Sequence, residues 1–358
     1  MNKKAMKCSE LSILAANLPD VASRPQEEQQ LILEAAGEQI KILRSIIKGG
    51  EQKKNNANSA IVELAIDATA EEFKSARIRQ AVRRGADVYL PSWSAMSQAL
   101  PSSFLRTALF SCATNVTSEN ERVLAGDSTL LVANKVIASF SSVSLVLSGN
   151  ELCQFDRQVY AACLDYYRDF PLATSDCKQY QETNFYEFSR RMGNQYSKNL
   201  HKSIQASLLR LRSVELRIKY KRANLEALKL MTVYFEDDSE GGDFKASDRI
   251  SICITNEIAE LFGVGDWTAV EMPVVKLKGL AAWVAHFYAS HSESRELSIE
   301  TLYKLSGYQS KFSNFKASLK QVLEKLADES IPAHTRVSSY VFSEDDKKIT
   351  VKLSPWKK

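Results

Sequence analysis

The stretch that decides the fold runs from residue 183 to residue 222 and reads TNFYEFSRRMGNQYSKNLHKSIQASLLRLRSVELRIKYKR. Its pattern predicts a short helix, a turn at Gly193, a longer helix and then a strand. Between Arg190 and Arg222 it holds ten lysines and arginines and one acidic residue, Glu215, whereas the whole chain has a formal net charge of +4. Such a dense basic patch on two helices joined by a turn is typical of proteins that read duplex DNA.

The two helices are defined by their ends and by their apolar faces. Asn184 followed by Glu187 has the form of a capping box that begins the first helix, and Gly193 suits the turn after it. In the second helix, over 197–211, one face carries Leu200, Ile204, Leu208 and Leu211. At about 3.6 residues per turn the opposite face carries Lys198, Asn199, Lys202, Gln205 and Ala206, with Leu209 among them.

This outer face matches the chemistry of a major groove. Lysine contacts phosphate or guanine, asparagine and glutamine contact adenine edges, and alanine packs on a thymine methyl group. Arg210 and Arg212 extend the basic character along the helix. The sequence therefore predicts a recognition helix, and the alternative is an ordinary solvated helix face.

The segment after the helix reads as a hairpin. Apolar Val214, Leu216, Ile218 and Tyr220 alternate with charged residues, which is the period of a half-buried strand. A return strand is expected over 228–235. A helix-turn-helix followed by a hairpin is a winged helix, and its wing would contact phosphates through Arg217, Lys219, Lys221 and Arg222.

The same pattern recurs near the C-terminus, displaced by the 114 residues that separate Gly193 from Gly307. A strand at 250–254 and a helix at 276–291 come first. Ser298 then caps a short helix over 299–305, and a long helix at 311–326 and a hairpin over 337–342 and 349–353 follow. The outer face of the second long helix offers Lys311, Asn314, Lys316 and Lys320, a less basic set than the first.

These patterns predict an α+β chain with two tandem winged-helix domains, a pseudo-repeat preceded by a helical N-terminal extension. Residues 1–90 are expected to form a helical, partly flexible arm with a polar linker near 49–58. The first winged-helix domain is expected over 91–248, with short strands at 104–110, 130–136 and 143–147 and a helix at 155–169. The second is expected over 249–358.

Composition and absent motifs exclude several classes of function. No apolar window is long enough to cross a membrane, and no signal peptide is recognisable. The six cysteines are scattered, which favours free thiols in a reducing cytoplasm. There is no phosphate-binding loop, no clustered histidine pair and no base beside the tyrosines, so we expect no metal, no cofactor and no catalysis.

The sequence resembles the TrfA family of broad-host-range plasmid replication initiators over about residues 91–326. The resemblance is carried by Leu105–Phe110, Gly193 with Leu208-x-Arg210-Leu211, Ile252–Phe262, Phe287–His291 and Leu297–Thr301. It implies a protein that is not an enzyme, binds tandem direct repeats (iterons) at an origin, helps open adjacent AT-rich DNA, and contacts single-stranded origin DNA.

The resemblance also implies partners: the host replicative helicase, the host initiator, and a second copy of the chain in an inactive homodimer. The family's sliding-clamp motif contains a glutamine before a leucine. The corresponding positions, Ala86–Leu90, hold no glutamine, so the resemblance does not extend to binding of the sliding clamp.

Two other classes of function stay open at this point. One is a winged-helix transcriptional regulator that represses its own promoter, and the other is a metal-dependent nuclease.

Overall fold

The computed structural model describes residues 87–113, 117–140, 142–174, 179–221, 223–236, 244–291, 294 and 296–355. The chain divides into two compact units, Met1–Ala70 and Glu71–Lys358, and all described residues belong to the second. The expected arm over 1–90, with its linker near 49–58, thus lies outside the described residues except for 87–90.

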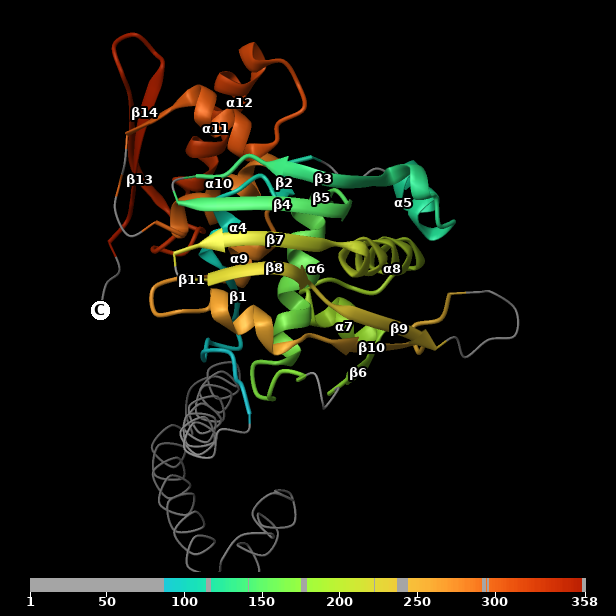
Figure 1. Cartoon of the computed structure of the whole chain (residues 1–358). Helices are drawn as coiled ribbons and strands as arrows, with labels where there is room; N and C mark the ends of the chain where they lie inside the picture. Colours follow the sequence, from blue (N-terminus) through green and yellow to red (C-terminus); the bar gives the residue numbers. More distant parts are fainter. Residues whose placement is uncertain are drawn as a thin grey trace, which may run out of the picture. The chain divides into compact units, whose positions relative to one another are not determined.

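The first hydrophobic cluster surrounds α6 (Gln154–Tyr166), a helix buried on all sides. Its residues from Val159 to Leu164 are completely covered. Asp156, in the first turn, stabilises the start of the helix, because its Oδ2 accepts a hydrogen bond from the backbone N–H of the N-cap residue Cys153 at 2.9 Å. Figure 1 shows α6 behind the strands of a four-stranded sheet.

This antiparallel sheet has the strand order β3-β4-β7-β8. Its strands are β3 (Leu131–Ile137), β4 (Val143–Asn150), β7 (Glu215–Tyr220) and β8 (Ala223–Lys229). The inner face carries apolar residues such as Leu145 and Leu216, which the alternation of apolar and polar residues predicts. The expected return strand over 228–235 is wrong: β8 ends at Lys229, and buried Leu230 and Met231 carry the chain to another sheet.

That second sheet has the order β6-β10-β9, made of β6 (Gln181–Asn184), β9 (Thr232–Glu236) and β10 (Arg249–Cys253). The strand expected at 250–254, at the start of the second domain, is therefore β10, and it pairs with two strands of the first cluster. The division of the chain at 248/249 stays a prediction.

The central helices lie close to their expected positions. Asn184 accepts the N–H of Glu187 at 2.8 Å and begins α7 (Phe185–Arg191). Gly193 follows with a φ of 74°, a left-handed conformation that glycine adopts without strain. Ser197 then accepts the N–H of Leu200 at 3.2 Å and begins α8 (Lys198–Ser213).

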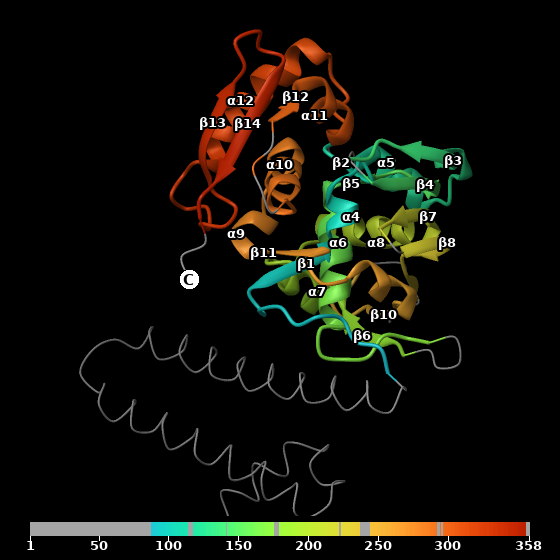
Figure 2. The same ribbon diagram turned by 60° about the vertical axis from the view of Figure 1, so that its left-hand side comes forward.

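The second hydrophobic cluster contains the C-terminal elements. Its helices are α9 (Met272–Val275), α10 (Gly279–Ala289), α11 (Ile299–Ser306) and α12 (Phe312–Leu326). Its sheet has the order β12-β14-β13, made of β12 (Glu296–Ser298), β13 (Val337–Phe342) and β14 (Lys348–Leu353). Gly307 ends α11 with a φ of 60°. Figure 2 shows the β13–β14 hairpin alongside α12.

Shorter elements complete the described chain. The region around 104–110 was expected to be a strand, but Ser102–Leu105 form the helix α4, and only Phe110–Ser111 form a strand, β2. The others are β1 (Ser97–Pro101), α5 (Thr117–Leu124), the 3₁₀ helix η1 (Ser128–Leu130), β5 (Leu152–Cys153), the 3₁₀ helix η2 (Asn256–Leu261) and β11 (Trp267–Glu271).

Backbone hydrogen bonds contribute to the joint between the two clusters. Strand β1, with Ala99 and Leu100 of the first cluster, pairs with β11, with Val270 of the second, in an antiparallel ladder. The N–H of Ser102 donates to the carbonyl of Asp266 at 2.7 Å, and the N–H of Cys112, a residue of the second cluster, donates to the carbonyl of Ser306 at 2.7 Å. Arg106 adds side-chain hydrogen bonds to Ser290.

Within the described residues, no helix is long and apolar enough to cross a membrane. The cysteines described are Cys112, Cys153, Cys163 and Cys253, and all four are buried free thiols. Burial raises the pKa of the Cys153 thiol to about 12, so it stays protonated and unreactive at neutral pH.

Candidate nucleic-acid interface

The N-terminal half of α8 presents a basic surface to solvent. Lys198, Asn199 and Lys202 are exposed, while Ile204 and Leu208 on the other side of the helix are completely buried in the first cluster. Lys202 Nζ lies 5.5 Å from the ring centre of Phe244. Because the helix starts here, its free backbone N–H groups and partial positive charge add to the attraction for an anion.

The other half of the predicted outer face is covered. Ala206 is completely buried, and Gln205 is half-buried with an Oε1 atom that has no hydrogen-bond partner. Helices α5 and α6 both pack along α8, which periodicity within a single helix cannot reveal. The surface that remains for base reading is therefore the first turns of α8, with Lys198, Asn199 and Lys202.

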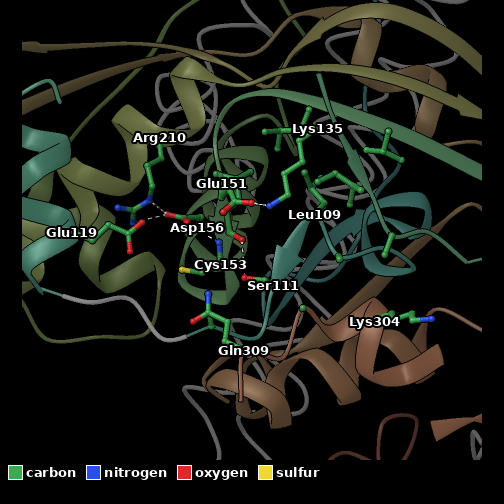
Figure 3. Close-up of a pocket in the computed structure, with 18 residues that line it drawn as sticks. Leu109, Ser111, Glu119, Lys135, Glu151, Cys153, Asp156, Arg210, Lys304 and Gln309 are labelled. Carbon is green, nitrogen blue, oxygen red and sulfur yellow. Dashed lines mark hydrogen bonds and ion pairs between the residues drawn. The ribbon is translucent and has the colours of Figure 1, made fainter. Parts of the chain in front are cut away.

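Arg210 was expected on the DNA surface, and this placement is wrong. Its side chain is 2% exposed, and Nε and Nη2 donate to Asp156 Oδ1 at 3.0 and 2.8 Å, while Nη1 donates to Asn120 Oδ1 at 2.9 Å. Figure 3 shows the guanidinium directed at Asp156. Burial opposes its charge, but the Asp156 carboxylate holds the pKa of Arg210 above its usual value. The ion pair joins α8 to α6, and the burial of the guanidinium keeps it away from a phosphate in solution.

The basic residues of β7 lie in a broad sheet. Arg217 and Lys219 are exposed on its outer face, opposite Val146 and Ser144 of β4. Since the inner face of this sheet packs into the same cluster as α8, these two cations stand on the far side of the sheet from that helix. Arg217 donates to Asn134 Oδ1 on β3.

The remaining predicted residues of this segment have different surroundings. Arg212 is exposed near the end of α8. Lys221 is exposed but forms an ion pair with Asp266, which offsets its charge locally. Arg222 lies outside the described residues. The structure therefore does not gather the whole predicted set on one surface.

The second long helix repeats the arrangement on a smaller scale. Lys311, Asn314 and Lys320 are exposed on α12. Lys316 is partly covered, with Nζ 2.7 Å from Asp346 Oδ2 and 5.6 Å from the ring centre of Phe342, so the hairpin loop already neutralises it.

An exposed aromatic residue beside this set was missed. Phe312 is 47% exposed and makes an edge-to-face contact with Tyr303, at 5.3 Å between ring centres. Phe312 is the first residue of α12, whereas Phe315 is buried one turn later. Its place at the very start of the helix could have indicated its exposure.

The geometry defines a mixed α+β protein in which two helices, each preceded by a short helix and a glycine turn, expose lysine and asparagine at their N-terminal ends. The chain belongs to the TrfA protein family, a family of plasmid replication initiators, whose pattern matches residues 62–343.

Comparisons with solved structures and curated proteins complete this description. A crystal structure of domains 2 and 3 of RctB has 11% identity and a TM-score of 0.41, covering 63% of this chain and 90% of that one. A second crystal structure of RctB domains 2–3 has 9% identity and a TM-score of 0.38, covering 62% and 90%. No curated protein sequence matches the chain.

Proposed function

We propose that the protein initiates replication by binding tandem direct repeats in duplex DNA at a plasmid or mobile-element origin. The observation that carries the proposal is the exposed set Lys198, Asn199 and Lys202 on the first turns of α8. Lysine supplies phosphate contacts and asparagine can pair with an adenine edge, so the set combines affinity with base preference.

We propose further that the chain contains two winged-helix domains, with α8 and α12 as recognition helices. Each helix follows a short helix and a left-handed glycine, and strands follow each helix. Lys311 and Asn314 of α12 correspond in type to Lys198 and Asn199 of α8. The first copy would dominate affinity, because Lys316 of the second is paired with Asp346.

Family membership supports the later steps of the same proposal. After binding its repeats, the protein would help open an adjacent AT-rich segment, contact the single strand, and recruit the host helicase and initiator in the cytoplasm. It would use no cofactor and carry out no catalysis, and a homodimer would be its inactive form. We do not expect it to bind the sliding clamp through residues 86–90, because Leu90 in this segment is completely buried in the first cluster.

The experiment is selection of bound duplexes from a random library by the purified full-length protein. A single asymmetric motif that recurs in tandem on the parent replicon supports an iteron-binding initiator. An inverted repeat would instead indicate a symmetric dimer on an operator, and a transcriptional regulator would then be the better interpretation. Incubation of origin DNA with Mg²⁺ or Mn²⁺ tests the nuclease class, and nicking would contradict the proposal.

Substitutions then locate the surface. Lys202→Ala should lower affinity for specific and random DNA alike, since a phosphate contact carries no sequence information. The matched control is Lys325→Ala, an exposed lysine in the last turn of α12, which should leave affinity unchanged. Equal losses in both variants would mean that only net charge matters and would remove α8 from the interface.

A further inference from the structure

The core holds a second buried arginine, Arg157 of α6, which is 1% exposed. Its Nε donates to Gln154 Oε1 at 2.7 Å, and its Nη1 lies 2.8 Å from His286 Nε2. Its Nη2 is buried and has no hydrogen-bond partner. In contrast to Arg210, it forms no ion pair with any residue that the structure describes, so a buried positive charge there lacks a counter-charge.

The two side chains that contact the guanidinium, His286 and Gln154, are neutral and do not compensate its charge. His286 Nδ1 lies 2.7 Å from the carbonyl of Ala282, which places the ring proton on Nδ1 and leaves Nε2 to accept from Arg157. Burial, with the adjacent Arg157, holds the pKa of His286 well below its usual value, so the ring is neutral. Gln154 already uses its oxygen for Arg157 and donates to the carbonyl of Phe110.

A small cavity adjoins this group, and its lining includes Arg157, His286 and Trp283. The space open to the centre of a water-sized sphere is about 10 Å³, which admits one small particle. Trp283 Nε1 is also buried without a partner. Two residues that line this cavity, Arg157 and Trp283, therefore each have a buried N–H donor without an acceptor.

We propose that this cavity binds a single chloride ion, held by Arg157 Nη2 and Trp283 Nε1 between α6 of the first cluster and α10 of the second. An acceptor with negative charge satisfies both donors and neutralises the guanidinium. A water molecule would accept from both donors but leave the charge uncompensated and its own two protons without acceptors. A carboxylate or phosphate ion is too large for the space. Because the two helices belong to different clusters, the bound ion strengthens the joint between them.

The test is the thermal stability of the full-length protein at constant sodium concentration and ionic strength, with chloride replaced stepwise by glutamate. Chloride should raise Tm by roughly 2–4 °C for each tenfold increase above its dissociation constant, and bromide should act like chloride. Equal Tm values in chloride and in glutamate would overturn the proposal.

The variant that tests the site is Trp283→Phe, which keeps a ring in the core but removes one donor. It should weaken the chloride-dependent rise in Tm at least several-fold, while Trp267→Phe, in β11 outside this cavity, should keep the full rise. A full rise in both variants would show that chloride acts elsewhere.

A direct measurement remains valid even if the variant fails to fold. Crystals of the unaltered protein grown in bromide should give an anomalous-scattering peak next to Arg157 Nη2. Density without anomalous signal at that position would be a water molecule, and an empty cavity would likewise refute the site.

Discussion

Replacing Arg210 with methionine distinguishes a buried structural arginine from a phosphate contact. The substitution keeps most of the aliphatic volume but removes all donors, which leaves the Asp156 carboxylate buried without its cation. Removing one partner of a buried ion pair costs about 3–5 kcal/mol. The three hydrogen bonds lost, two of them to a carboxylate, give a similar figure at about 1.5–3 kcal/mol for each charged one.

Urea unfolding followed by circular dichroism measures this loss of stability. Fluorescence anisotropy on a labelled duplex at several salt concentrations measures how DNA affinity depends on salt. We expect Arg210→Met to lose about 3–5 kcal/mol of unfolding free energy while the slope of log affinity against log salt is unchanged. Lys202→Ala should show the reverse, with stability within about 0.5 kcal/mol and a slope smaller by about 0.9.

The pair Asp156→Asn with Arg210→Met supplies the control. Asparagine removes the orphaned charge and can still accept from the Cys153 N–H, so the double variant should be more stable than the two single losses predict, by about 0.5–3 kcal/mol. If Arg210→Met keeps its stability and instead loses about one unit of salt slope, Arg210 reaches a phosphate and the argument from burial fails.

Three further changes test other parts of the structure. Gly149→Ala should lose more than about 3 kcal/mol in urea unfolding, because φ is 116° and an added Cβ would lie 2.3 Å from the Ser213 carbonyl oxygen; Gly126→Ala, with φ 74° in open space, should lose only about 1 kcal/mol. Below pH 6.5 the histidine is protonated in the unfolded chain but stays neutral in the folded one, because burial lowers the pKa of His286. The free energy of unfolding therefore falls as pH falls, and His286→Gln should reduce this pH dependence by up to about 1.4 kcal/mol per pH unit. An unchanged slope would mean that His286 is protonated in the fold. Asn199→Ala should relax preference at one base pair by about 1–3 kcal/mol in competition binding, and an equal loss on random DNA would rule out base reading.

Local pattern was enough to locate most elements. The capping residues Asn184 and Ser298, the glycines at 193 and 307, and the alternation from Val214 to Tyr220 are signals within a few residues, and the structure has the corresponding helix starts, turns and strand. Family membership, inferred from scattered short segments, is confirmed by the match over residues 62–343.

The errors arose where distant segments meet. A helical wheel for α8 cannot show that α5 packs along this helix or that Arg210 pairs with Asp156 in the core, because both partners lie far away in the sequence. The same holds for Arg157, whose lack of an acidic partner becomes visible only once α6 and α10 are packed together. A run of basic residues therefore overstates the exposed charge, and only the structure separates lysines at the surface from arginines in the core.

The backbone connection between the two clusters constrains how such a protein could diverge. Main-chain hydrogen bonds join β1, which carries Ala99 and Leu100 of the first cluster, to β11, which carries Val270 of the second. Substitutions on the surfaces of α8 and α12 do not alter these bonds. Should both helices read DNA as proposed, a lineage could exchange one recognised sequence for another by changing a few exposed side chains, while the distance between the two recognised segments would be inherited unchanged.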